Sequence, residues 1–234
     1  MSEQNKAQWK VEASSDVRLS CWSAVVGAAI STIAILFFSI VVPGHALDGA
    51  KAQSAGFIVI NIAGATGMTL LVYGLPGVYA RWRERWGVLG LAGIALIALA
   101  EMIFGFVSLT AATLYSWLGS VAPDVFKDPN PAPLVSLVFM IWLVAIIAGN
   151  VLMAIAILRR RFAPRWVGFV QIGSAVMSLV YLAAALTPPS VPVSLVGSLG
   201  PILLCVALGY LGYQGVSEKR GVRAERAGIA ALRA

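Results

Sequence analysis

The chain has 234 residues, of which 59% are hydrophobic and only 12% are charged. Soluble domains carry about 25% charged residues, so this composition argues against a water-soluble globular protein. The formal net charge of +7 is spread over several short segments, which argues against a nucleic-acid-binding surface. The composition therefore indicates an integral membrane protein.

Six long apolar stretches follow one another along the chain. Each is at or near the roughly 20 apolar residues that an α-helix needs to cross about 30 Å of hydrocarbon. Transmembrane β-strands would instead alternate in polarity over about 10 residues. The sequence therefore predicts an all-α, polytopic transmembrane helical bundle with spans at about 21–42, 56–79, 87–109, 134–158, 166–186 and 191–213.

Basic residues fix the predicted orientation of this bundle. Every lysine and arginine except Lys51 and Lys127 lies in the N-terminal segment 1–18, in the second or fourth gap between spans, or in the basic tail 216–234. Cytoplasmic loops retain basic residues. We therefore expect a six-span domain over 19–215 in the cell membrane, with both termini cytoplasmic.

Three further features bear on the ends of the spans. The small residues at 44–46 resemble a signal-peptidase site, but the apolar run before them is longer than the usual ~7–15 residues of a signal sequence. We predict a first span that is retained. Trp82, Trp86 and Trp166 lie near predicted cytoplasmic ends, and their amphipathic rings predict anchors at the membrane interface. The prolines from Pro123 onwards predict a non-helical outer loop over 118–133.

Glu101 is the only acidic or basic residue inside a predicted span. At about 100° per residue it shares a helix face with small residues such as Gly105, so we expect it to point into the bundle. A charged residue in a span costs at least about 2.5 kcal/mol on insertion scales, which makes Glu101 the candidate catalytic residue for proton chemistry. The structural alternative is a protonated Glu101 that hydrogen-bonds Asn61, Ser178 or Tyr181.

Asn150 and Gln171 lie on the two arms of the hairpin 134–186, both in its cytoplasmic half. We expect the two amides to hydrogen-bond each other, a contact worth about 0.6–2 kcal/mol. The alternative is a polar substrate site, so Asn61, Asn150, Gln171 and Tyr181 are candidate binding residues. No cluster of residues has metal-ligand spacing, and we expect neither a metal ion nor a cofactor.

The segment Leu158-Arg-Arg-Arg-Phe-Ala-Pro-Arg-Trp-Val-Gly168 precedes a span, a proline-broken turn and a final span. It resembles the C-terminal half of a domain-of-unknown-function family of bacterial six-span membrane proteins, which carry the loop Arg-x-x-x-Pro-Arg-Trp-hydrophobic-Gly before span five. The resemblance covers residues 134–215. It implies a bacterial six-span protein and no particular activity.

The lack of a catalytic motif favours a non-enzymatic protein that acts by binding membrane lipids, a small lipophile or a protein partner. One alternative is a membrane-embedded enzyme that uses Glu101 as an acid on an isoprenoid or lipid, although a second acid or base is missing. Another is a small proton-coupled transporter. The pattern Arg-x-x-x-Arg-Trp at 81–86 and again at 161–166 would then be the trace of a duplicated hairpin.

Overall fold

A computed structural model describes residues 3–41, 47–127, 133–185 and 193–231. Six of its helical segments are long and apolar enough to cross a membrane. Within those described ranges there is no β-strand. The all-α transmembrane bundle is thus confirmed.

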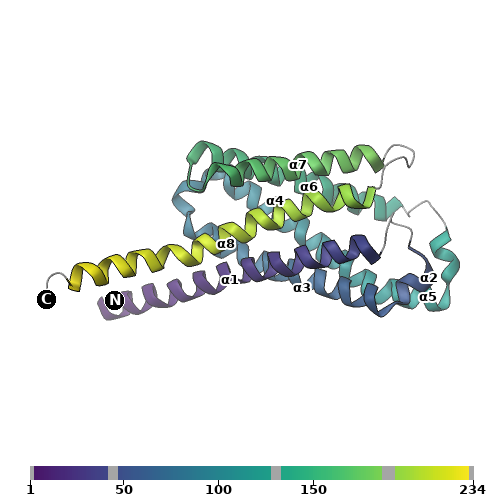
Figure 1. Ribbon diagram of the computed structural model, residues 1–234, viewed down its shortest axis with the longest axis horizontal. Helices are drawn as coiled ribbons and strands as arrows, with labels where there is room; N and C mark the ends of the chain where they lie inside the picture. The colour runs from purple at the N-terminus through teal and green to yellow at the C-terminus, as the bar shows by residue number, and fades with distance from the viewer. Residues whose placement is uncertain (1–2, 42–46, 128–132, 186–192, 232–234) are drawn as a thin grey trace.

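The long helices run along one common axis (Figure 1). Each packs mainly against two others, so that together they form a ring. Around the ring the order is α1, α3, α4, α6, α7, α8 and back to α1. Their bounds are α1 Glu3–Val41, α3 Ala55–Arg81, α4 Arg83–Thr110, α6 Pro133–Arg160, α7 Arg165–Ala185 and α8 Val193–Ala231. Because helices adjacent in sequence are also adjacent in the ring, the topology requires only short connections.

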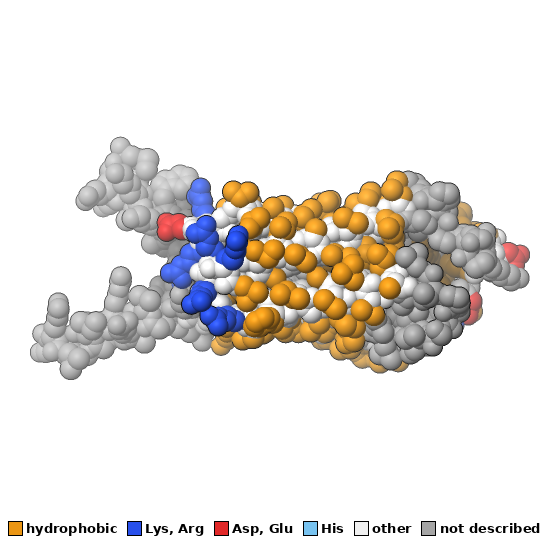
Figure 2. All heavy atoms as spheres, turned by 90° about the horizontal axis from the view of Figure 1, so that it is seen from above, with side chains coloured by type: hydrophobic (Ala, Val, Ile, Leu, Met, Phe, Trp, Pro, Cys, Tyr) orange, Lys and Arg blue, Asp and Glu red, His pale blue; other side chains and the backbone are white. Residues whose placement is uncertain are grey.

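Arginine side chains gather at one end of the bundle (Figure 2). Two connections lie there, between α3 and α4 and between α6 and α7, together with both chain termini (Figure 1). We call this the arginine-rich end; its arginines are Arg81, Arg83, Arg85, Arg159, Arg160, Arg161 and Arg165. The opposite, far end carries the short helices α2 (Gly49–Gln53) and α5 (Ser116–Val121).

The first and last helices are longer than the predicted spans. Helix α1 begins at Glu3 and α8 continues to Ala231, so both project past the arginine-rich end (Figure 1). The flanking segments 1–18 and 216–234 are therefore largely continuations of the spans as helix. The possible signal-peptidase site at 44–46 lies outside the described residues.

The third span also runs further than predicted. Helix α4 passes through a π-helical turn at Ala111–Tyr115 into α5, and this path ends only at Val121. A 3₁₀-helix at Pro123–Lys127 follows. The prediction of a non-helical loop from residue 118 was wrong because Pro123 is the first proline after the span, and the helix continues almost up to it.

Trp82 and Trp86 are buried, and the prediction that they anchor the membrane interface was wrong for both. Trp86 is 1% exposed. Its ring centroid lies 4.5 Å from that of Phe162, which also packs against Trp82. Gly87 has φ +59° and breaks the helical path after Trp86. Trp166, in the second copy of the Arg-x-x-x-Arg-Trp pattern, is 41% exposed and therefore sits in a different environment.

Candidate functional site

A cavity of about 520 Å³ occupies the half of the bundle next to the far end. Its wall is mostly apolar, and all six long helices contribute to it. The wall includes Phe38 of α1, Asn61 of α3, Phe104 of α4, Trp142 of α6, Tyr181 of α7 and Pro201 of α8. Small-molecule sites in proteins typically have volumes of about 300–1,000 Å³ and apolar linings. The cavity is thus large enough for a small lipophilic molecule.

Aromatic side chains form one side of the cavity. Phe104 stacks on Trp142 with ring centroids 5.4 Å apart, and Phe139 lies 5.2 Å from Trp142. Phe139 in turn meets Tyr181 at 5.9 Å in an edge-on arrangement. These offset and edge-on contacts are the arrangements that aromatic quadrupoles favour. The four rings connect α4, α6 and α7 into one continuous wall.

Helices α2 and α5 lie beside the far-end side of the cavity. The backbones of Gly49 and Gly119 approach so closely that a Cβ on Gly119 would lie 2.6 Å from the carbonyl oxygen of Gly49. Leu47, two residues before α2, and Tyr115, directly before α5, both line the cavity. The two short helices therefore hold side chains that shape its outer wall.

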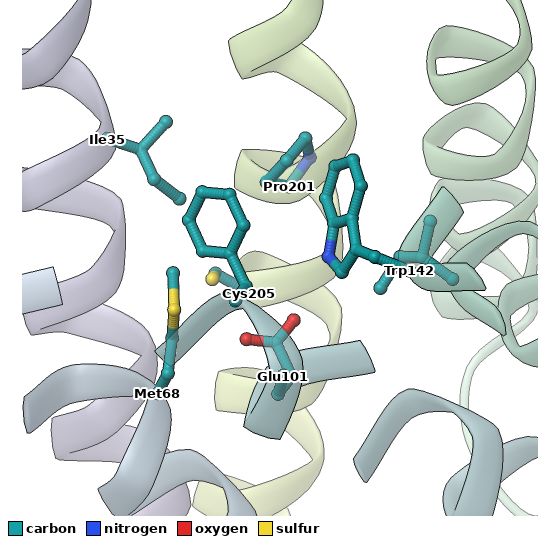
Figure 3. A pocket seen from close by; sticks show the side chains of 8 residues that line it. Ile35, Met68, Glu101, Trp142, Pro201 and Cys205 are labelled. Atoms are coloured by element: carbon teal, nitrogen blue, oxygen red, sulfur yellow. The ribbon is translucent and has the colours of Figure 1, made fainter. Parts of the chain in front are cut away.

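A second, much smaller void of about 10 Å³ lies beside Glu101 (Figure 3). This volume is close to the minimum that holds one water molecule. In Figure 3 the carboxyl group lies among Met68, Trp142 and Cys205. Of the described residues, five line both voids: Ile35, Met68, Phe104, Trp142 and Pro201. The small void beside Glu101 is therefore next to the large cavity.

Glu101 is 6% exposed, so the prediction that it points into the bundle is confirmed. None of its three predicted partners, however, lines the small void. Asn61 donates to the carbonyl oxygen of Phe57 at 2.9 Å, and Ser178 to that of Ser174 at 2.9 Å. Each thus satisfies a donor within its own helix. Among the residues that the structure describes, none hydrogen-bonds the Glu101 carboxyl group.

The predicted hydrogen bond between Asn150 and Gln171 is wrong. The Nδ2 of Asn150 donates to the carbonyl oxygen of Ile146 at 2.8 Å, and the Nε2 of Gln171 lies 3.8 Å from the Sδ of Met153. Both amide oxygens are buried without a partner.

The reason is the depth of the two residues along their helices. Gln171 lies six residues after Arg165, and the residue six before Arg159 is Met153, whereas Asn150 lies nine before it. Three residues correspond to about 4.5 Å along the axis, which puts the Asn150 amide one turn too deep.

The five predicted site residues thus fall into two groups. Asn61 and Tyr181 line the large cavity and Glu101 lies directly beneath it, but Asn150 and Gln171 line neither void. The sequence interpretation missed the aromatic wall. Trp142 could have indicated this wall, because it is the one tryptophan in the sequence that lies far from either end of a predicted span.

Comparisons with known proteins give no relative: no family model, no curated protein and no solved structure matches the chain. The resemblance to the bacterial six-span family stays a prediction. Within the described part of the chain, no three His, Cys, Asp or Glu side chains are grouped so that they could hold a metal ion.

Proposed function

We propose that this integral membrane protein is not an enzyme and that it binds a small, mainly apolar molecule in the 520 Å³ cavity. The observation that carries the proposal is the size and lining of this cavity, which is walled by all six long helices. Protein interiors are normally close-packed, with few voids larger than a water molecule. The cavity opens at the exposed side chains of Phe106 and Val107, so a ligand could enter it from the surface of the bundle.

The lining favours binding over chemistry. Acid–base catalysis generally needs two positioned groups with different proton affinities. Among the described residues, Glu101 is the only acidic or basic side chain that lines either void. The remaining polar side-chain groups of the large cavity are hydroxyls, one amide and the indole N–H of Trp142, which suit the orientation of a ligand.

We also propose that both termini and the arginine-rich end face the cytoplasm. The grouping of the arginines at one end supports this orientation, because cytoplasmic loops retain basic residues. Reporter fusions at Trp82 and Phe162 should then report cytoplasm, and a fusion at Asp124 should report the outside. The reverse pattern would contradict the proposal. In the proposed orientation the cavity lies in the outer half of the membrane.

A pair of matched substitutions on α3 tests ligand binding. A Cβ on Gly64 would lie 3.8 Å from Ala34 and Ser108, in ordinary van der Waals contact, and both neighbours line the cavity. Gly64→Leu should therefore fill part of the cavity without disturbing the helices. Gly56→Leu makes the same change on the same helix, where a Cβ would meet nothing within 4 Å.

The measurement is calorimetric binding of phenylbutanol, a neutral lipophile, to the protein in lipid nanodiscs, with empty nanodiscs as the background. We expect saturable binding to the wild type and to Gly56→Leu. Gly64→Leu should weaken it by about tenfold or more, which corresponds to about 1.4 kcal/mol. No saturable binding above the background, or equal affinity in both variants, would contradict the proposal.

A further inference from the structure

We propose that the ligand of this cavity is a hydrophobic primary amine. Its apolar body would occupy the 520 Å³ cavity, and its ammonium group would enter the small void and pair with the carboxylate of Glu101. This inference rests on the proposed binding function and specifies the chemical class of the ligand.

The first argument is the unsatisfied carboxyl group. A buried polar group without a hydrogen-bond partner costs free energy, and a buried charge without a counterion costs far more. Glu101 is 6% exposed and directed into the void (Figure 3). The void is otherwise lined by hydrocarbon, sulfur and aromatic groups, with the indole nitrogen of Trp142 on the side that faces the void (Figure 3). A ligand that brings hydrogen-bond donors and a positive charge would satisfy the carboxylate.

The second argument is size. The void of about 10 Å³ holds roughly one water-sized group. A primary ammonium group is of that size, whereas a trimethylammonium group is several times larger. The adjoining large cavity has room for the rest of the molecule, so the two voids match a small polar head on an apolar body.

The third argument is the aromatic wall. Phe104 and Trp142 line both voids. The faces of Phe and Trp rings attract cations within about 6 Å of the ring centroid, most strongly for Trp. No Lys, Arg or His side chain within the described residues lines either void to repel a cation. A neutral hydroxyl head would gain the hydrogen bond but not this attraction.

Binding of the amine releases a proton when Glu101 is in its acid form. Glu101–COOH and R–NH₃⁺ become the ion pair Glu101–COO⁻ and R–NH₃⁺, and the proton leaves to the solvent. The other titratable groups around the voids are Cys205 of α8, Tyr181 of α7 and Tyr115 of the π-helical turn; the described lining residues of α1, α3 and α6 include none. Glu101 is thus the group that we expect to lose the proton.

The test compares three probes with the same apolar body: phenylbutylamine, phenylbutanol and phenylbutyltrimethylammonium. Each is titrated calorimetrically into nanodiscs at about pH 6, where an alkyl ammonium group stays charged. Two buffers of different ionisation enthalpy count the protons released. We expect the amine to bind about tenfold or more tightly than both other probes, with release of up to one proton per amine.

Glu101→Gln should remove the proton release and lower the amine affinity to that of phenylbutanol, while phenylbutanol binding stays unchanged. Ser108→Ala, a change of another buried polar side chain of the large cavity, is the matched control and should keep the amine preference. If Glu101→Gln does not fold, a pH series on the wild type replaces it. The preference for amine over alcohol should then rise with pH, by up to about tenfold per pH unit for one released proton.

The outcomes separate the two proposals. Equal affinities for amine and alcohol, an unchanged amine preference in Glu101→Gln, or a preference that is flat with pH would overturn the amine assignment and leave the lipophile cavity standing. Tight binding of the trimethylammonium probe would overturn the placement of the head group in the small void. If no probe binds above empty nanodiscs, both proposals fail.

Discussion

The two halves of the bundle are made from the same helices but differ in how closely the helices approach. Helix α3 shows the contrast along its own length. A Cβ on Gly74 would lie 2.4 Å from Ala24 of α1, and one on Gly77 would lie 2.6 Å from Ser20. Towards the far end, a Cβ on Gly64 would find its nearest atoms at 3.8 Å. Along α3 the close approach to α1 thus extends from Gly77 to Gly67, where a Cβ would lie 2.6 Å from Ser31, and ends at Gly64 beside the cavity.

The arginine half is therefore the closely packed support of the bundle, and the cavity half contains the candidate binding site. In the arginine half, small residues let α1 and α3 pack directly, and the hydroxyl of Ser20 donates to the carbonyl oxygen of Tyr73 at 2.7 Å across the two helices. In the cavity half, the stacked rings of Phe104 and Trp142 take the place of such a seam. The comparison implies that substitutions in the arginine half act on stability, whereas substitutions in the cavity half act on binding.

Phe162→Ala should give the largest loss of stability. Phe162 is 7% exposed and fills the space beside Trp82 and Trp86 at the arginine-rich end. Removal of a buried Phe side chain costs about 3–5 kcal/mol. The free energy of unfolding in detergent, measured by denaturant titration, should fall by that amount. Phe169→Ala is the control, because Phe169 is 61% exposed. Similar losses for the two variants would mean that the arginine-rich end is not tightly packed.

Gly74→Ala tests the helix seam with a single added carbon. The nearest atoms to the new Cβ would include the backbone nitrogen of Ala24 at 2.4 Å, so the two helices must move apart. Overpacking of this kind costs about 1–3 kcal/mol. Gly64→Ala adds the same carbon in the cavity half and should be close to neutral. If both variants unfold at the same denaturant concentration, the contrast between the halves is wrong.

Asn150 and Gln171 provide a smaller test within the arginine half. Because the two amides do not bond each other, Asn150→Leu and Gln171→Met should act independently on stability. A double-mutant cycle should give a coupling free energy below about 0.5 kcal/mol. A coupling free energy of about 1 kcal/mol or more would show that the two side chains do interact, as the sequence analysis predicted.

The sequence predicted the helices and the inward direction of Glu101 because both follow from long-range patterns. Apolar length defines a span, and helical periodicity places a residue on a face. It did not predict the cavity, since an aromatic residue that faces a void and one that faces lipid look alike in an apolar stretch. Phe37 and Phe38 are neighbours on α1, yet Phe38 lines the cavity while Phe37 is 53% exposed and does not.

Two of the other failures concern particular side-chain contacts. Asn150 lies nine residues from Arg159, whereas Gln171 lies only six residues from Arg165. This difference of three residues decides that Met153, and not Asn150, lies beside the Gln171 amide. The burial of Trp86 involves its contact with Phe162, which belongs to a different connection of the bundle. Neither feature changes the composition of a span, so neither is visible in a pattern of apolar residues.

The smallest expected effect concerns Asp48, which caps α2 at the far end. The backbone N–H of Lys51 donates to its Oδ1 at 2.7 Å, and this hydrogen bond, together with the Lys51 ammonium group 3.5 Å from Oδ2, lowers the pKa of Asp48 below its ordinary 3.8. A carboxyl group with a lowered pKa stabilises the folded state above its unfolded pKa, and this contribution is lost as the pH falls through the lowered value.

Protection of the Lys51 amide against hydrogen exchange, corrected for the intrinsic rate, should therefore be constant from about pH 6 down to about pH 4 and decrease below it. Asp48→Asn keeps a capping oxygen without a titratable charge, so its protection should not decrease in that range. A decrease of the same size in Asp48→Asn would show that acid acts elsewhere in the cavity half, and not through the cap of α2.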